Sequence, residues 1–174
     1  MSITEEKAAK IKLLILDVDG VLTNGQIMIN DRGEEIKCFN VKDGQGLRLL
    51  TKAGIDVVII SGRRSGAVEH RAEDLGIKEV HLGVSHKEPL CKNLIQQKKL
   101  NKDQVCCIGD DLPDLSMFNQ AGFTVAVADA VVEVREAADL VTKNRGGNGA
   151  IREVCEWILK AQKRWPDLIS LFKG

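Results

Sequence analysis

Short apolar runs that alternate with helix-forming stretches constrain the fold of this chain more than any other feature. The runs at 12–16, 55–60, 105–108 and 123–127 are only a few residues long and mostly apolar, which is typical of strands buried on both faces. Stretches with helical periodicity separate them, so helical crossovers are expected between the strands. The sequence therefore predicts an α/β fold: a doubly wound, Rossmann-like, mostly parallel sheet with helices on both faces.

The length and composition fit a single domain over residues 1–174. A chain of 174 residues can bury a proper core, and its 44% hydrophobic and 29% charged residues are ordinary for a globular protein. No repeat, low-complexity tract or linker interrupts the pattern. The other expected elements are strands at 79–82 and 140–142, and helices at 43–53, 65–75, 87–100, 112–119, 131–138 and 149–165.

The charge balance excludes several classes of partner. The 25 basic residues equal the 25 acidic ones and aromatic residues make up 3%, so neither a nucleic acid nor a membrane surface is an expected partner. The apolar runs fall far short of the roughly 20 residues of a membrane helix, and residues 1–10 lack a signal-peptide core. A cytoplasmic protein is expected. The five cysteines form no C-x-x-C pair, which favours buried thiols over a zinc site or disulfides.

Polar residues follow the predicted strands at their carboxyl ends, which is where open α/β sheets bind ligands. Because these ends meet at one edge of a parallel sheet, we expect the side chains to converge. They are Asp17 and Asp19 after the first strand, Ser61 after the second, Lys87 at the start of the helix after the third, and Asp110, Asp111 and Asp114 after the fourth.

Carboxylates gathered at one edge repel one another unless a cation neutralises them. Ligation by oxygen atoms alone favours a hard ion, and Mg²⁺ typically takes a few carboxylates together with phosphate and water. Ser61, the backbone N–H groups around Gly62, and Lys87 are suited to hold the phosphate. The pattern therefore predicts Mg²⁺-dependent phosphoryl transfer, for which an aspartate nucleophile is known chemistry.

These residues resemble the four motifs of the haloacid dehalogenase superfamily of phosphatases: D-V-D-G-V-L-T from Asp17, I-I-S-G-R around Ser61, Lys87, and G-D-D-L-P-D around Asp110. The resemblance implies that Asp17 is the nucleophile and that Asp19 protonates the leaving group and then activates water. It also implies that Ser61 and Lys87 hold the phosphate. The implied Mg²⁺ ligands are Asp17, the backbone carbonyl of Asp19, and Asp110, with Asp111 or Asp114 in support.

A narrower resemblance covers residues 12–162. Besides the motifs, F-N-V-K-D-G (39–44), V-A-V-A-D-A (125–130) and G-G-N-G-A-I-R-E-V (146–154) are similar to the 3-deoxy-D-manno-octulosonate 8-phosphate phosphatase family. This implies hydrolysis of that sugar phosphate in lipopolysaccharide precursor synthesis. It also implies a homotetramer whose hairpins meet at the centre and whose subunits complete one another's active sites.

A hairpin is predicted at 25–40, and the chain has no room for a cap domain besides it. Its turn is N-D-R-G (30–33), and apolar residues occupy both of its faces. Such a ribbon either packs on its own domain or pairs with copies of itself. The tail at 166–174 also carries four large apolar residues, so it is expected to pack, either on its own domain or on a neighbouring subunit.

Substrate specificity is open between eight- and nine-carbon 2-keto-3-deoxy acid phosphates. Arg63 favours the eight-carbon acid, whereas Asn24 and Asn148 depart from the usual family pattern. Arg71 lies about 12 Å along the helix from Arg63, which suits a neighbour's site. The resemblance implies substrate contacts by Asp19, Asn40, Val41, Lys42, Asp43, Gly44, Ser61, Gly62, Arg63, Arg71 and Lys87.

Three alternatives remain at this point. A response-regulator receiver uses similar groups but places its phospho-accepting aspartate after the third strand, where this chain has Leu82-Gly83. A non-catalytic module with the same fold is a second alternative, against which the four intact motifs argue. A phosphomutase is a third, but such enzymes use a cap to exclude water.

Overall fold

The computed structural model describes residues 2–173, and a six-stranded sheet forms its centre. The strand order is β5-β4-β1-β6-β7-β8, and all five neighbouring pairs are parallel. This confirms the predicted α/β fold with a doubly wound parallel sheet. The strands are β1 (Leu13–Leu16), β4 (Asp56–Ser61), β5 (Glu79–Leu82), β6 (Val105–Gly109), β7 (Phe123–Ala126) and β8 (Leu140–Val141).

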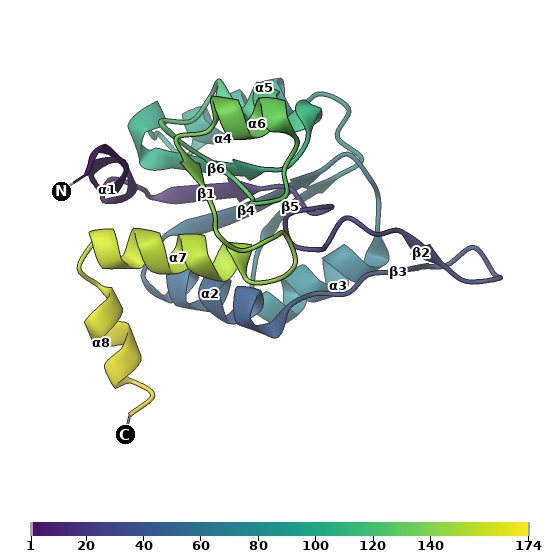
Figure 1. Ribbon diagram of the computed structural model, residues 1–174, viewed down its shortest axis with the longest axis horizontal. Helices are drawn as coiled ribbons and strands as arrows, with labels where there is room; N and C mark the ends of the chain where they lie inside the picture. The colour runs from purple at the N-terminus through teal and green to yellow at the C-terminus, as the bar shows by residue number, and fades with distance from the viewer. Residues whose placement is uncertain (1, 174) are drawn as a thin grey trace.

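Helices cover both faces of this sheet (Figure 1). One layer holds α2 (Val41–Lys52), α3 (Gly66–Leu75) and α7 (Ala150–Ala161), and the other holds α4 (Lys87–Gln97), α5 (Leu115–Phe118) and α6 (Val132–Ala137). The remaining helices are α1 (Ile3–Ala8), α8 (Trp165–Ser170) and the 3₁₀ turns η1 (Lys102–Gln104) and η2 (Leu112–Asp114).

The core lies between the sheet and its two helical layers. All four residues of β1 are 0% exposed, because helices cover both faces of this central strand. On α7, Ile151, Val154 and Ile158 are likewise buried and form the apolar stripe predicted from the sequence. Each such side chain contributes about 1.5–3 kcal/mol by leaving water. All five cysteines are free and four are buried, but Cys38 on the hairpin is exposed, which corrects the expectation of buried thiols there.

The strand order excludes the receiver alternative. Numbered along the chain, the six strands of the large sheet run 3-2-1-4-5-6, whereas receivers have the order 2-1-3-4-5. The direction of winding reverses between β1 and β6. Open α/β sheets bind ligands in the crevice at such a reversal, beyond the carboxyl ends of the strands.

The hairpin forms at the predicted place and projects from the body of the protein (Figure 1). Its strands β2 (Met28–Ile29) and β3 (Glu35–Ile36) pair with each other and not with the large sheet. Ile27, Met28, Ile29 and Ile36 are between 38% and 63% exposed. Within one chain, these apolar side chains therefore do not pack on their own domain.

Several element ends differ from the predicted ones. α2 begins two residues early, because the Asn40 side chain accepts the N–H of Lys42 (2.8 Å) and caps the helix. The helix predicted at 149–165 stops at Ala161, and the chain turns through Lys163, whose φ is +58°, into α8. α1 was not predicted; Ser2 and Glu5 form a capping box at its start.

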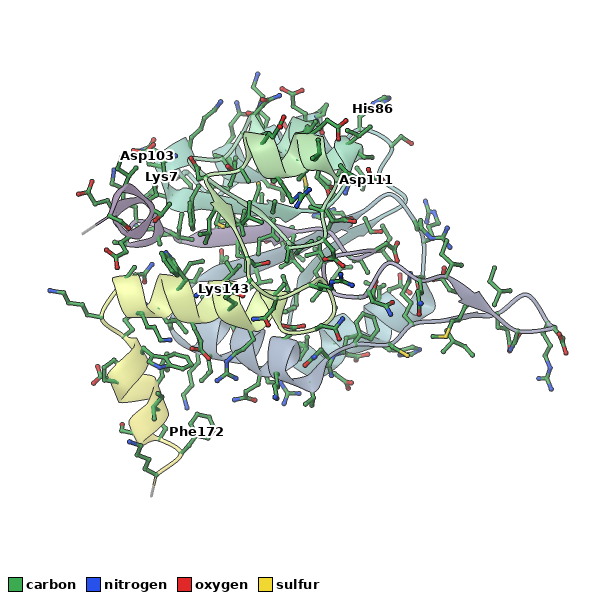
Figure 2. The ribbon with its side chains drawn as sticks, viewed as in Figure 1. Lys7, His86, Asp103, Asp111, Lys143 and Phe172 are labelled. Atoms are coloured by element: carbon green, nitrogen blue, oxygen red, sulfur yellow. The ribbon has the colours of Figure 1, made fainter. Side chains whose placement is uncertain are left out.

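The C-terminal tail packs only in part. Leu168 is buried, while Leu171 and Phe172 are 57% and 66% exposed, and Phe172 lies at the far end of α8 from the sheet (Figure 2). The last tail residue, Gly174, lies outside the described residues. Among residues 2–173, no helix combines the length and the apolar character needed to cross a membrane.

Candidate active site

A cavity of about 810 Å³ opens at the carboxyl ends of β1, β4 and β6. It lies at the reversal of the sheet, where the sequence predicted the site. His86 and Asp111 mark its rim in Figure 2. Of the predicted site residues, the cavity brings together Asp17, Asp19, Ser61, Gly62, Arg63, Lys87, Asp110, Asp111 and Asp114.

Lys87 joins two of the carboxylates. Its Nζ donates to Oδ1 of Asp17 (2.8 Å) and to Oδ1 of Asp114 (2.7 Å), and its side chain is only 6% exposed. Burial by itself would lower the pKa of Lys87, but the two carboxylates outweigh it and raise that pKa above the ordinary value. The ammonium is therefore held charged against Asp17.

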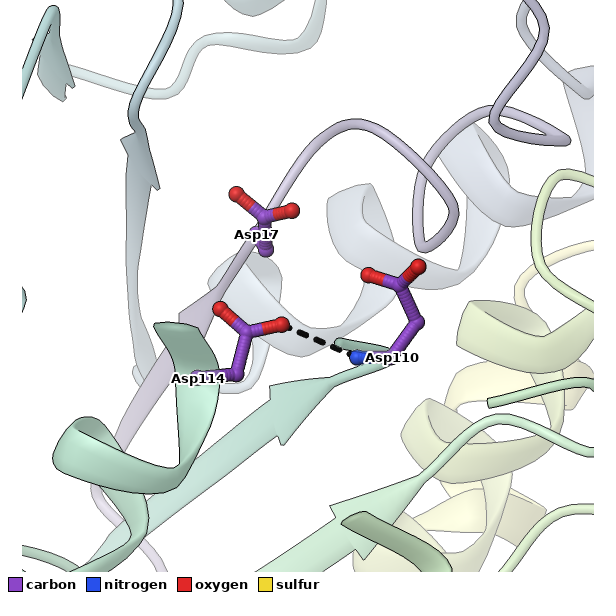
Figure 3. Close-up of side chains that lie close together, drawn as sticks. All are labelled: Asp17, Asp110 and Asp114. Carbon is purple, nitrogen blue, oxygen red and sulfur yellow. Dashed lines mark hydrogen bonds between the residues drawn. The ribbon is translucent and has the colours of Figure 1, made fainter. Parts of the chain in front are cut away.

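Asp17, Asp110 and Asp114 form a cluster of carboxylates (Figure 3). One oxygen of each lies within 4.8 Å of the others. Oδ2 of Asp114 accepts the N–H groups of Asp110 (2.9 Å) and Asp111 (3.3 Å), while its Oδ1 accepts from Lys87. Oδ1 of Asp110 is buried and finds no hydrogen-bond partner within residues 2–173. Both carboxylate oxygens of Asp114 thus accept hydrogen bonds within the protein, whereas Asp17 and Asp110 have oxygens that can bind a ligand.

Burial and mutual repulsion disfavour ionisation of two carboxylates of this cluster, Asp17 and Asp110. Burial, followed by the nearby charge of Asp114, raises the pKa of Asp17 to about 6 even though Lys87 opposes the shift. Burial and the charges of Asp114 and Asp17 raise the pKa of Asp110 to about 8. When all three carboxylates are ionised they face one ammonium, and two negative charges then lack compensation. A divalent cation with oxygen ligands fits both this charge and the unpaired oxygen of Asp110.

Ser61 and the turn after β4 also line the cavity. Ser61 is 2% exposed, and its Oγ accepts the N–H of Arg63 (3.2 Å). Its carbonyl accepts the N–H of Val84 (3.0 Å), which ties this turn to the loop after β5. A hydroxyl and the backbone of Gly62 thereby line the same cavity as Lys87, as a phosphate site requires.

Asp19 belongs to a ring of alternating charges that the sequence reasoning missed. Lys37 Nζ contacts Oδ1 of Asp19 and lies 3.1 Å from Oε1 of Glu35. Arg63 pairs with Oε2 of Glu35, and its Nε lies 3.7 Å from Oδ2 of Asp19. Burial acts to raise the pKa of Glu35, but the hydrogen bond from Arg63 and the ion pair with Lys37 lower it to about 2. Glu35 and Lys37 come from the hairpin, so the hairpin takes part in the site.

A signal for these two residues was present in the sequence. Side chains two apart on a strand point to the same face, so Glu35 and Lys37 form an opposite-charge pair on one face of the ribbon. Only the apolar residues of the hairpin entered the prediction. Ser85 and His86, just before Lys87, also line the cavity.

The segment Asn40–Gly44 and Arg71 are not among the described residues that line this cavity. The buried carboxylate of Asp43 accepts the N–H groups of Gly149 (3.1 Å) and Arg152 (2.8 Å) and so caps α7. The Arg71 guanidinium lies close to Gly44 and 6.0 Å from the centre of the Phe39 ring. The substrate contacts of Asn40–Gly44 and Arg71 stay predictions. Within one chain, these residues form a group separate from the cavity.

The two positions that depart from the family pattern make local contacts. The Asn24 side chain accepts the N–H of Gln26 (3.1 Å), and Asn148 Nδ2 donates to the carbonyl of Gly146 (3.2 Å). Neither is among the described residues that line the cavity. Nothing in these contacts distinguishes an eight-carbon from a nine-carbon substrate.

Comparison with known proteins gives consistent matches. A family profile described as haloacid dehalogenase-like hydrolase matches residues 80–154. The chain is 46% identical to the 3-deoxy-D-manno-octulosonate 8-phosphate phosphatase of Yersinia pestis, over 91% of this chain and 85% of that protein. It is 45% identical to the same phosphatase of Haemophilus influenzae, over 91% and 88%.

A solved structure matches almost the whole chain. It is the phosphatase of the same name from Moraxella catarrhalis, in complex with magnesium, phosphate and KDO. It superposes with a TM-score of 0.96 at 42% identity and covers 99% of both chains.

Proposed function

The chain belongs to the 3-deoxy-D-manno-octulosonate 8-phosphate phosphatase family of haloacid dehalogenase-like hydrolases, and on this premise we propose that it hydrolyses that sugar phosphate. The products are the free sugar acid and inorganic phosphate, in lipopolysaccharide precursor synthesis, and the required metal is Mg²⁺. The observation that carries the proposal is the buried contact of Lys87 with Asp17, beside the unpaired oxygen of Asp110.

The first chemical step is transfer of the phosphoryl group to Asp17. A carboxylate oxygen of Asp17 attacks phosphorus, the bond from phosphorus to the sugar oxygen breaks, and protonated Asp19 gives its proton to that oxygen. Lys87 and Ser61 lie beside Asp17 and bind the phosphoryl oxygens. The sugar acid leaves with the proton, and an aspartyl-phosphate and an ionised Asp19 remain.

The second step restores the enzyme. Asp19 takes a proton from a water molecule, whose oxygen attacks phosphorus, and the bond between phosphorus and Asp17 breaks. Inorganic phosphate is released, and Asp17 is again a carboxylate while Asp19 is again protonated. The two steps therefore use the same two residues, and Asp19 enters the first step protonated and the second step ionised.

The metal site consists of Asp17, Asp110 and the backbone carbonyl of Asp19. When bound, Mg²⁺ neutralises the charge of the carboxylates and of the phosphate, so that one anion can approach another. Asp114 positions this site by holding Lys87 and the backbone of Asp110. Asp111 accepts the N–H of Leu112 (2.8 Å) and so shapes the loop after β6.

Steady-state kinetics with defined substrates test the proposal. We expect phosphate release that depends on Mg²⁺ and a higher kcat/KM for the eight-carbon 2-keto-3-deoxy acid phosphate than for its nine-carbon counterpart. Asp17→Asn should abolish turnover. If the nine-carbon acid phosphate is preferred, the substrate assignment is wrong. If Asp17→Asn retains turnover, the nucleophile is wrong and the non-catalytic alternative gains support.

Two further assignments belong to this proposal. The hairpin, with its exposed Ile29 (63%) and Ile36 (51%), forms the centre of a homotetramer in the cytoplasm. In this tetramer, the segment Asn40–Gly44 and Arg71 complete the cavity of a neighbouring subunit. Burial of such apolar side chains is the driving force for association. Sedimentation of a monomer at working concentrations would contradict this assembly.

A further inference from the structure

The carboxylate of Asp19 is held by the hairpin through Lys37. The Lys37 side chain is only 2% exposed, and its Nζ contacts Asp19 at one oxygen, Oδ1. The other oxygen, Oδ2, has Arg63 Nε at 3.7 Å, which is beyond hydrogen-bond distance. One carboxylate oxygen is thereby fixed, and the other stays available beside the cavity.

We propose that Lys37 is a positioning residue for phosphoryl transfer: it holds Asp19 so that Oδ2 delivers the proton to the leaving oxygen of the substrate. The inference rests on the proposed function, because it assigns Lys37 a part in the proton transfer at Asp19. Lys37 itself exchanges no proton and touches no reacting atom. Its role is to fix the orientation of the group that does.

The burial of Lys37 separates this contact from an ordinary surface ion pair. Exposed pairs contribute little to stability and hold neither side chain firmly. A buried ammonium, by contrast, must keep its partners, because an unpaired buried charge is strongly destabilising. Lys37 has two such partners, Asp19 and Glu35. The geometry of Asp19 is therefore determined by the hairpin as well as by its own loop.

The contact with Lys37 stabilises the negative charge that Asp19 acquires during the reaction. After Asp19 has given its proton to the sugar oxygen, it carries a full negative charge, and Lys37 Nζ already lies against that charge. Groups that are in place before charge develops stabilise a transition state without the cost of reorganisation. Glu35 completes the arrangement, because it bonds Arg63 and lies beside Lys37, and so keeps both cations at the site.

The dependence of the rate on the leaving group tests this role. A sugar alkoxide needs a proton in order to leave, whereas 4-nitrophenolate leaves without one. Single-turnover rates of phosphoryl transfer are measured for both phosphate esters with the wild type, Asp19→Asn, Lys37→Met and Lys37→Arg. Lys37→Met should slow transfer from the sugar phosphate roughly 10- to 100-fold, a part of the 10²–10⁴-fold contribution of general acid catalysis, and transfer from 4-nitrophenyl phosphate less than about threefold.

The controls separate positioning from folding. Lys37→Arg should restore most of the rate, because it keeps the charge. Lys98→Met is the matched control, because Lys98 also bridges two carboxylates, Asp56 (3.0 Å) and Glu79 (2.5 Å), but at the opposite edge of the sheet, where β4 and β5 begin. It should leave both rates unchanged. A crystal structure of Lys37→Met should show the Asp19 carboxylate displaced.

The outcomes distinguish a failure of the role of Lys37 from a failure of the proposed function. Equal losses with both esters, or no loss with the sugar phosphate, overturn the role of Lys37 while the phosphatase activity stands. If the wild type does not hydrolyse the sugar phosphate, the proposed substrate fails instead. The same comparison is then made with glycerol phosphate as the alkyl ester, so Lys37 is still tested.

Discussion

Gly20 lies directly against Asp110: a Cβ atom on Gly20 would be 2.0 Å from Oδ2 of Asp110. Gly20 follows β1 and Asp110 follows β6, so the absence of a side chain lets the two loops of the proposed metal site meet. Gly20 also has a φ of +88°, which other residues rarely adopt. Steric space and backbone conformation thus both require glycine here.

We therefore expect Gly20→Ala to weaken Mg²⁺ binding. The added methyl group must push the Asp110 carboxylate aside, and disturbing the surroundings of metal ligands typically costs roughly 10- to 100-fold in affinity. The measurement is the Mg²⁺ concentration that gives half-maximal activity. Gly66→Ala at the start of α3 is the control, because within residues 2–173 no atom beyond its chain neighbours and its own helix backbone lies within 4 Å of the added Cβ. Equal Mg²⁺ requirements in both variants would contradict the prediction.

Replacing Asp110 should stabilise the metal-free protein while it abolishes activity. Oδ1 of Asp110 is buried without a partner and faces two other carboxylates, so Asp110→Asn removes a repulsion. The free energy of unfolding in chelator should rise by about 1–3 kcal/mol, because the amide carries no buried charge and its N–H groups can donate to the neighbouring carboxylates. Urea denaturation measures it. Added Mg²⁺ should stabilise the wild type and have no such effect on Asp110→Asn.

The Asp110 carboxyl also predicts how the stability of the metal-free protein depends on pH. The pKa of Asp110 is raised from 3.8 to about 8 by burial and by the carboxylates of Asp114 and Asp17. Between these values the folded state keeps a proton that the unfolded state has lost, so stability falls as the pH rises through this window. Unfolding experiments in chelator at pH 5 and pH 8 should show the fall. Asp110→Asn should reduce it, and an unchanged slope would argue against this assignment.

Asp43 should matter for the stability of the fold. Its carboxylate caps α7 from α2 through the N–H groups of Gly149 and Arg152, and loss of a helix cap costs about 1–2 kcal/mol. We expect Asp43→Ala to lower the free energy of unfolding by this amount. Asp103→Ala is the control: Asp103 is 69% exposed and has only a 3.5 Å pair with Lys10. A loss of kcat/KM in protein that remains folded would show that Asp43 also contacts substrate.

Charged residues on the hairpin should disrupt the assembly and not the fold. Ile29 and Ile36 are 63% and 51% exposed in one chain, so Ile29→Lys with Ile36→Lys leaves the core intact. Sedimentation velocity should show smaller species than the wild type, with circular dichroism unchanged. Val132→Lys, on the exposed surface of α6 (50%), should leave the assembly as it is. Identical sedimentation of all three proteins would remove the hairpin from the interface.

The sequence predicted features that follow from hydrophobic patterning better than features that depend on single hydrogen bonds or dihedral angles. The strands were predicted well because β1 is buried on both faces and so is apolar throughout. The ends of helices were predicted less well: α2 begins early because of the Asn40 side chain, and the last predicted helix breaks near Lys163. These ends depend on single hydrogen bonds and dihedral angles, which hydrophobic periodicity does not record.

The candidate site shows the same division. Asp17, Ser61, Lys87 and Asp110 were predicted together because each lies at or shortly after the carboxyl end of a strand, and parallel strands bring these ends to one edge. The contribution of Lys37 was not predicted. It depends on how a hairpin folds back over a loop about 18 residues earlier in the chain.

By itself, therefore, the sequence determined the parallel α/β fold and which carboxylates, hydroxyl and amine meet at its active edge. The fold and this set of residues follow from hydrophobic patterning along the chain and from the parallel direction of the strands, and neither depends on an individual side-chain contact. Only the tertiary structure decided which oxygen of each carboxylate is paired: Asp114 is fully bonded, Asp110 keeps a free buried oxygen, and Asp19 is held by Lys37. Hydrogen bonds act over a few ångströms between segments distant in sequence, so their partners are fixed only when the chain has packed.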